Sequence, residues 1–118
     1  MILLVDDNLE QLELRQMILE REGFTVATAG SAGDAIEQCG QCRAVVMDLR
    51  LPALQDGLAL IRNLYTGNSA RPIVVLAGLP EELRGRPEQS MVHHVLRKGT
   101  ATAVLLELLR SLSRPSTP

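Results

Sequence analysis

The sequence predicts a three-layer α/β protein with a parallel β-sheet at its centre. Short apolar runs recur along the chain, and longer segments with helical spacing of apolar residues lie between them. An all-apolar run is typical of a strand covered on both faces, and a helix between consecutive strands makes the crossover that a parallel sheet requires. With 118 residues, 46% of them hydrophobic, the chain is long enough for one domain with one core.

Five segments are expected to be strands. They are residues 2–5, 24–28, 44–47, 73–77 and 92–97. The last segment contains two histidines, so its pattern is less apolar than that of the others. Right-handed crossovers leave few arrangements of such strands. Among them we expect the flavodoxin-like (βα)5 order 2-1-3-4-5, in which the first and third strands are neighbours.

The first two helices have recognisable beginnings and ends. Residues 8–22 are expected to form a helix that stops at a glycine, with Leu9 and Met17 off its apolar side. Ser31 resembles the start of a capping box, and a second helix should follow it as far as residue 39. The side chains expected to face the core are Leu12, Leu14, Ile18, Leu19, Ala35, Ile36 and Cys39.

Three further helices are expected. Residues 57–65 form the third, and residues 81–91 should form a short or kinked fourth because Gly85 and Pro87 interrupt it. The last, residues 101–112, carries one narrow apolar stripe. The core-facing residues are Leu58, Leu60, Ile61 and Leu64 in the third helix, and Ala101, Val104, Leu105, Leu108 and Leu112 in the last. We expect the domain to span residues 1–113, and residues 114–118 to be a flexible tail or the start of a linker.

Composition argues against several classes of function. The net charge is −2 and the aromatic residues are Phe24 and Tyr65, whereas direct nucleic-acid binding usually requires a basic excess with interleaved aromatics. No run approaches the roughly 20 apolar residues of a membrane span, and the first residues lack the basic region of a signal peptide. We therefore expect a cytoplasmic protein that binds neither nucleic acid nor membrane.

The two cysteines form a C-x-x-C pair, Cys39 and Cys42. A redox motif of this kind should open a helix, whose N-terminus stabilises the thiolate, but this pair closes one. A zinc site would need two more ligands, and the available histidines, His93 and His94, lie far along the chain. We expect ordinary unpaired cysteines.

Charged residues stand at the ends of several predicted strands. Asp6 and Asp7 follow the first strand, Asp48 follows the third, and Lys98 follows the fifth. The carboxyl ends of parallel strands form the functional edge of an open sheet, so these groups should converge there. Three close carboxylates repel one another, and a hard cation such as Mg²⁺ would offset that repulsion. Taken singly, each has an ordinary explanation as a helix cap, a turn former or a surface charge, but those explanations do not account for the coincidence.

Four motifs carry a resemblance to a known family. The stretches "ILLVDDN", "VVMDLRLP" with a following Asp56-Gly57, "PIVVLAG" and "VLRKG" occur in this order. In order and spacing they resemble the receiver domain of bacterial two-component response regulators, over residues 2 to about 112.

The resemblance implies a role for each charged residue. Asp48 would accept a phosphoryl group from a sensor histidine kinase or a phosphotransfer protein. Asp7, Asp48 and the backbone carbonyl of Arg50 would hold Mg²⁺ or Mn²⁺, with Asp6 acting through a water molecule. Lys98 would pair with the phosphoryl oxygens. A domain of this kind is a signalling module rather than an enzyme, beyond catalysing its own phosphorylation and dephosphorylation.

Several positions depart from the family pattern. Ala77 stands where a Ser or Thr usually contacts the phosphoryl group, and Val95 stands where a Tyr or Phe usually moves inward on activation. Gly99 replaces the proline that usually follows the lysine, and the loop of residues 52–57 is one residue longer than usual. Gly78 is small, as in the family, and should leave access to Asp48 open.

These departures leave three readings of function. The first is a phosphoacceptor with an atypical output switch at Ala77 and Val95. Its output face would comprise the fourth helix, the fifth strand and the last helix, with Leu106 and Leu109 exposed for a partner or a second copy. The second is a degenerate receiver that binds a partner independently of phosphate. The third is a phosphatase of the haloacid dehalogenase type, which would need an aspartate where Asn8 stands.

Overall fold

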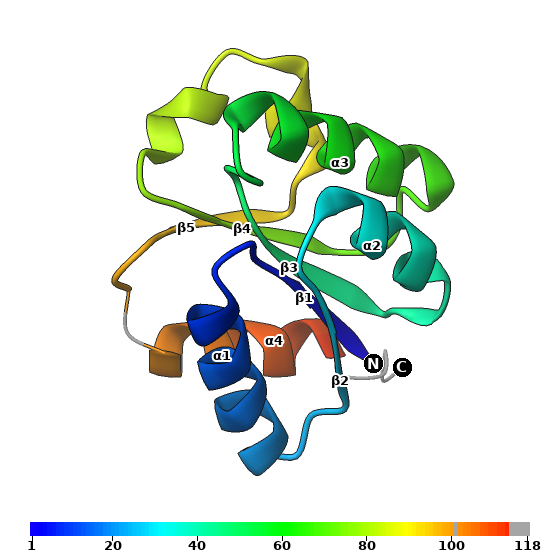
Figure 1. The fold of residues 1–118 in the computed structure, drawn as a ribbon. Helices are drawn as coiled ribbons and strands as arrows, with labels where there is room; N and C mark the ends of the chain where they lie inside the picture. Colours follow the sequence, from blue (N-terminus) through cyan, green and yellow to red (C-terminus); the bar gives the residue numbers. More distant parts are fainter. Residues whose placement is uncertain (101, 114–118) are drawn as a thin grey trace.

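A five-stranded parallel sheet forms the centre of the computed structural model, which describes residues 1–100 and 102–113 (Figure 1). The strand order β2-β1-β3-β4-β5 is the predicted one. The strands are β1 (Ile2–Val5), β2 (Val26–Ala29), β3 (Ala44–Asp48), β4 (Ile73–Ala77) and β5 (His94–Arg97). Because β1 and β3 are neighbours, the two segments that end in aspartates lie side by side.

Helices cover both faces of the sheet, as a parallel sheet requires. The α-helices are α1 (Leu9–Arg21), α2 (Ala32–Gln38), α3 (Leu54–Gly67) and α4 (Thr102–Ser113). Helices α2 and α3 lie on one face, and α1 and α4 on the other (Figure 1). A short 3-10 helix, η1 (Cys39–Gln41), follows α2 directly. In the described part of the chain, no helix has the length and apolar character needed to cross a membrane.

The strand residues divide the core into two clusters. Side chains alternate across the pleat, so Leu3 and Val5 of β1 face α2 and α3, whereas Ile2 and Leu4 face α1 and α4. Strands β1, β3 and β4 are buried along their whole length, which explains why they are apolar without alternation. The sheet is therefore a rigid frame for whatever follows its strand ends.

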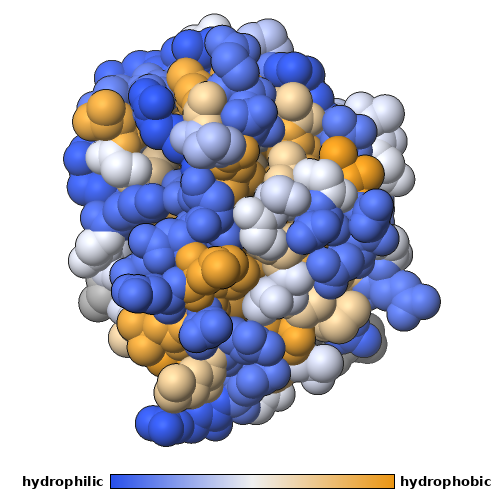
Figure 2. All heavy atoms as spheres, in the orientation of Figure 1, coloured by the Kyte–Doolittle hydropathy of each residue, from blue (hydrophilic) through white to orange (hydrophobic). Residues whose placement is uncertain are grey.

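The beginnings of α1 and α2 agree with the sequence. The side chain of Asn8 accepts a hydrogen bond from the backbone N–H of Gln11, and Ser31 caps α2 by accepting from the N–H of Asp34 at 3.1 Å. Other boundaries differ from expectation by up to three residues, as at the beginning of α3. Two core assignments in α1 and α2 were wrong, because Leu14 and Ile36 are exposed. Apolar side chains on the visible face form small separate patches among hydrophilic ones (Figure 2).

The segment between β4 and β5 does not form the expected fourth helix. Two 3-10 helices take its place, η2 (Pro80–Leu83) and η3 (Pro87–Met91). They are separated at Gly85, whose positive φ of 77° is incompatible with a continuous helix, and the second begins with a proline. Arg62 on α3 holds η3 in place by donating to Glu88 at 2.6 Å, and this hydrogen bond lowers the pKa of the Glu88 carboxyl.

The last helix faces the core with a wider side than expected: Leu105, Leu108 and Leu112 pack there as predicted, and Leu106 and Leu109 do so as well. Leu105, Leu106 and Leu109 are buried, whereas Val104 is exposed, and Ala101 lies outside the described residues. Leucines occupy so much of this helix that more than one stripe fits a helical period, so periodicity alone did not determine its rotation. Leu106 and Leu109 are therefore core residues, and the prediction that they are exposed for a partner was wrong.

Gly57 allows α3 to lie against the end of β3. A Cβ atom at this position would lie 1.6 Å from the backbone oxygen of Leu49, the residue after Asp48. No relaxation of a side chain could remove that overlap, because the obstacle is backbone. The close approach of α3 to the Asp48 segment therefore depends on glycine at this position.

We expect Gly57→Ala to lower the free energy of unfolding by about 3 kcal/mol or more, because α3 must move away from Leu49. Gly33→Ala in α2 is the matched control. Its Cβ would be no closer than 3.9 Å to a neighbour, so stability should stay unchanged or rise by up to about 1 kcal/mol. Urea unfolding of both variants measures the difference, and equal effects would contradict the role given to Gly57.

Candidate functional site

Three carboxylates meet at the carboxyl edge of the central strands. Val5 pairs with Met47 across β1 and β3, so the residues that follow, Asp6 and Asp48, emerge next to each other. One oxygen from each of Asp6, Asp7 and Asp48 lies within 4.8 Å of the other two. Asp6 and Asp48 are only 1% and 5% exposed, while Asp7 is exposed. The predicted convergence of the three aspartates is therefore present in the structure.

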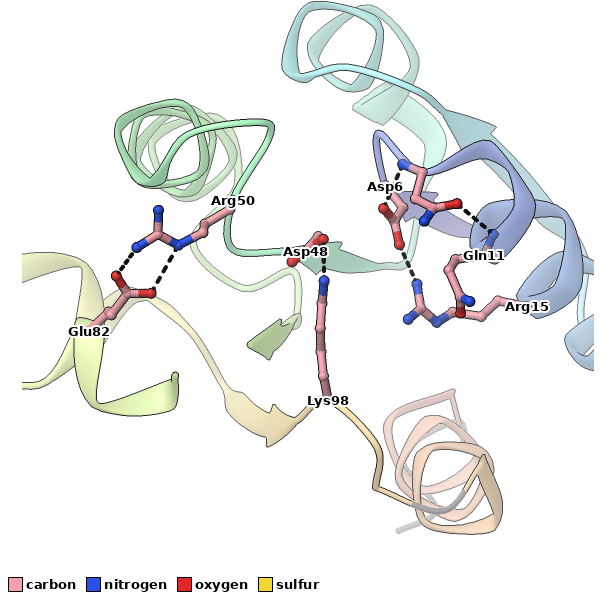
Figure 3. A network of polar contacts seen from close by, with 8 residues as sticks. Asp6, Gln11, Arg15, Asp48, Arg50, Glu82 and Lys98 are labelled. Carbon is pink, nitrogen blue, oxygen red and sulfur yellow. Dashed lines mark hydrogen bonds and ion pairs between the residues drawn. The ribbon is translucent and has the colours of Figure 1, made fainter. Parts of the chain in front are cut away.

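Lys98 supplies a positive charge from the end of β5. Its backbone N–H donates to the carbonyl of Ala77 at 2.8 Å, which fixes the beginning of the side chain beside the end of β4. Its Nζ atom donates to Oδ2 of Asp48 at 2.7 Å (Figure 3). The ammonium group thus offsets part of the negative charge of the carboxylate cluster.

A second cation, which the sequence interpretation missed, contacts Asp6. Arg15 of α1 donates from Nη1 to Oδ2 of Asp6 at 2.6 Å, and the backbone N–H of Asn8 donates to Oδ1 at 2.9 Å (Figure 3). The signal was present in the sequence, since residue 15 lies on the same helix face as the buried Leu12 and Leu19. A charged residue on a core-facing stripe requires a partner.

A third ion pair, also unforeseen, lies beside the site. The Arg50 guanidinium donates to both carboxylate oxygens of Glu82, with Nε to Oε1 at 3.3 Å (Figure 3). Arg50 lies two residues after Asp48, and Glu82 belongs to η2. The pair therefore joins the β3–α3 loop to the segment that replaces the fourth helix.

The positions that depart from the family pattern are buried or conformationally distinct. Ala77 is buried at the end of β4, and Val95 is partly buried against the cluster under α2 and α3. Gly99 has a φ of 92°, which a proline cannot adopt. The backbone after Lys98 therefore has a conformation that the family's usual proline would not allow. A Cβ at Gly78 would meet nothing within 4 Å.

The cysteines are unpaired, as predicted. Both Cys39 and Cys42 are free thiols, and Cys42 is buried. Burial raises the pKa of the Cys42 thiol, which makes its reactive thiolate scarce. Cys39 begins η1 and Cys42 follows it, so the pair lies just before β3 and not at the carboxyl ends of the strands.

The donor set of the cluster suits a hard divalent cation. Carboxylate oxygens are the ligands that Mg²⁺ prefers, and three of them stand close enough to share one ion. The sequence model of the family described as "Response regulator receiver domain" matches residues 2–110. This chain belongs to that family. Receiver domains are parts of two-component systems, and the flavodoxin-like order of the sheet agrees with this membership.

Several curated relatives are bacterial transcriptional regulatory proteins. This receiver domain is 30% identical to the CpxR homolog of Haemophilus influenzae over 70% of its length. It is 35% identical to AruR of Pseudomonas aeruginosa, again over 70% of the length of this receiver domain. In each case the match covers 36% of the relative, so the chain spans about a third of the length of these proteins.

Solved receiver domains share the fold. The response regulator TrrA from Thermotoga maritima, in complex with Mg²⁺-BeF, superposes with a TM-score of 0.82 at 23% identity, covering 94% of this chain and 96% of that one. A receiver domain from Methylobacillus flagellatus gives a TM-score of 0.81 at 27% identity, covering 95% and 97% of the two chains.

Repulsion within the cluster can be measured without metal. Asp7 is exposed and has no ion-pair partner within residues 1–100 and 102–113, so it adds unbalanced charge beside Asp6 and Asp48. We expect Asp7→Asn to raise the free energy of unfolding in EDTA by about 1 kcal/mol, the scale of one pair of like charges at this separation in water. Glu13→Gln, on an exposed position of α1, is the control and should have no effect. A loss of stability in Asp7→Asn would contradict this electrostatic account.

Proposed function

We propose that this receiver domain accepts a phosphoryl group on Asp48 from the phosphohistidine of a sensor kinase or phosphotransfer protein. The observation that carries the proposal is the position of Asp48, held at the end of a buried strand within a carboxylate cluster and contacted by Lys98 at 2.7 Å. Lys98 contacts Oδ2, which leaves Oδ1 as the nucleophile. Oδ1 would form the bond to phosphorus while the bond from phosphorus to the histidine nitrogen breaks, with its electron pair returning to the imidazole.

The side chains around Asp48 have separate tasks in this proposal. Lys98 would move its contact from the carboxylate to a phosphoryl oxygen, keeping one charge-assisted hydrogen bond throughout. Asp7, Asp48 and the backbone carbonyl of Arg50 would hold Mg²⁺ or Mn²⁺, with Asp6 reaching it through a water molecule. A bound cation supplies positive charge that offsets the phosphoryl oxygens. The complex of TrrA with Mg²⁺-BeF supports this assignment by analogy of fold.

The output is the part that we propose to be atypical. A buried alanine at position 77 offers no hydroxyl to the phosphoryl group, and Val95 offers no aromatic ring that could change position. These two positions also favour the second reading, a module that binds its partner independently of phosphate. The face of η2, η3, β5 and α4 stays our proposed contact surface for a partner or second copy, although the buried Leu106 and Leu109 no longer support it.

Asp48 should be the sole phosphorylation site. Incubation with acetyl phosphate and Mg²⁺ should add one phosphoryl group by intact-mass spectrometry, because one strand-end carboxylate has both the lysine and the other acids around it. Asp48→Asn should add none, while the control Asp34→Asn, at the exposed start of α2, should label as the parent does. Equal labelling of Asp48→Asn would refute the assignment.

Phosphorylation should change the structure only locally. We expect amide chemical shifts to move around Asp48 and at Lys98 with its immediate neighbours, and little elsewhere across residues 81–112. The reason is that Ala77 and Val95 interact alike with both states, and a phosphoryl group shifts a conformational equilibrium only by its differential interactions. Large shifts throughout η2, η3 and α4, or dimerisation seen only after phosphorylation, would show that another relay operates.

A further inference from the structure

We infer that Arg15 is a built-in competitor of the divalent cation: it neutralises Asp6 while the metal is absent and thereby weakens metal binding at the carboxylate cluster. The inference rests on the proposed function, because it concerns the same Asp6, Asp7 and Asp48. It goes beyond that function by giving the site a second cation from α1 and a role in setting metal affinity.

Both oxygens of Asp6 already have partners. Oδ2 accepts from Arg15 at 2.6 Å and Oδ1 accepts from the backbone N–H of Asn8 at 2.9 Å. The Asp6 side chain is 2% exposed and the Arg15 side chain 20%, so water screens this pair much less than a surface ion pair. Each oxygen can still accept one more hydrogen bond, so the competition is one of charge: a cation near Asp6 lies close to the Arg15 guanidinium.

Charge balance explains why Arg15 and a metal compete. The three carboxylates are partly balanced by Lys98 on Asp48 and Arg15 on Asp6. A divalent cation placed among the same oxygens meets two positive side chains at short range. At a separation of about 6 Å in a water-like medium, the repulsion between a unit charge and a divalent charge lowers the affinity for the divalent cation about tenfold.

A cavity beside Arg15 could hold its side chain when it leaves Asp6. A small cavity of about 60 Å³ lies between α1, the end of β5 and the beginning of α4, and Arg15, Lys98 and Thr100 are among its lining residues. The Thr100 hydroxyl donates to the carbonyl of Arg97 at 2.6 Å, so its oxygen can still accept a hydrogen bond. Three leucines also line this cavity, so a guanidinium that left Asp6 would lie at the edge of the apolar core and beside Lys98, with the Thr100 oxygen as its hydrogen-bond acceptor.

Substitutions that separate charge from hydrogen bonding test the inference. Arg15→Gln removes the charge and keeps N–H donors, and Arg15→Lys keeps the charge. Arg110→Gln is the control, since Arg110 forms an exposed pair with Glu22 at 3.0 Å outside the site. By isothermal titration with MgCl₂, we expect Arg15→Gln to bind Mg²⁺ about tenfold more tightly than the parent, with Arg15→Lys and Arg110→Gln within about twofold of it.

The outcomes separate this inference from the proposed function. Equal or weaker Mg²⁺ binding in Arg15→Gln, or equal shifts in Arg15→Gln and Arg15→Lys, would overturn the competition alone. Tighter binding in Arg15→Gln together with no phosphorylation of Asp48 would support the competition and overturn the phosphoacceptor assignment. An absence of Mg²⁺ binding in the parent and in all variants would overturn both the competition and the metal site.

Discussion

The mutual repulsion of three aspartates is the constraint around which this receiver domain is organised. Their oxygens lie within 4.8 Å of one another, and two of the three side chains are almost fully buried. Burial makes an unbalanced carboxylate costly, so each buried one is matched by a cation from a different element, Lys98 after β5 and Arg15 of α1. Ion pairs at the site thus connect α1 to the end of β1, and the end of β5 to the end of β3.

The apolar frame makes this concentration of charge possible. Strands β1, β3 and β4 are buried throughout, so their ends have little freedom to move apart in response to repulsion. Gly57 brings α3 against the backbone of Leu49 and fixes the segment that follows Asp48. Arg50 and Glu82 join this segment to η2 from outside. Rigidity at the strand ends keeps Asp48 beside Lys98 and the other two aspartates.

Sequence patterns predicted the parts of the site that topology determines. Asp48 ends a strand and Asp6 and Lys98 follow strands, and parallel strands bring their carboxyl ends together whatever the details of packing. Contacts made by long, flexible side chains of other segments could not be predicted in the same way. Arg15 lies in the second turn of α1, and its long side chain extends back to Asp6 before the helix. Arg50 contacts Glu82 because residues 80–83 form η2.

Helix rotation and helix interruption were the other limits. The leucines of α4 fit more than one apolar stripe, so only packing against the sheet decided that Leu106 and Leu109 lie inside. Between β4 and β5, the interrupting Gly85 and Pro87 were recognised, but their effect was larger than a kink. In both cases the local pattern allowed several structures, and tertiary contacts such as Arg62 with Glu88 selected one.

The same contacts bear on how this domain could signal. A switch needs an element whose interactions differ between two states, and the positions that depart from the family pattern hold Ala77 and Val95, which are aliphatic and already packed. Lys98 contacts Asp48 directly, so the proposed exchange onto a phosphoryl oxygen would require little movement. What changes most is charge, because a phosphoryl group adds negative charge where a carboxylate stood. Lys98 and Arg15 contact the buried carboxylates, and both line the cavity between α1, β5 and α4. An electrostatic response confined to that cavity would leave the outer face of β5 and α4 in one arrangement, ready for a partner in either state.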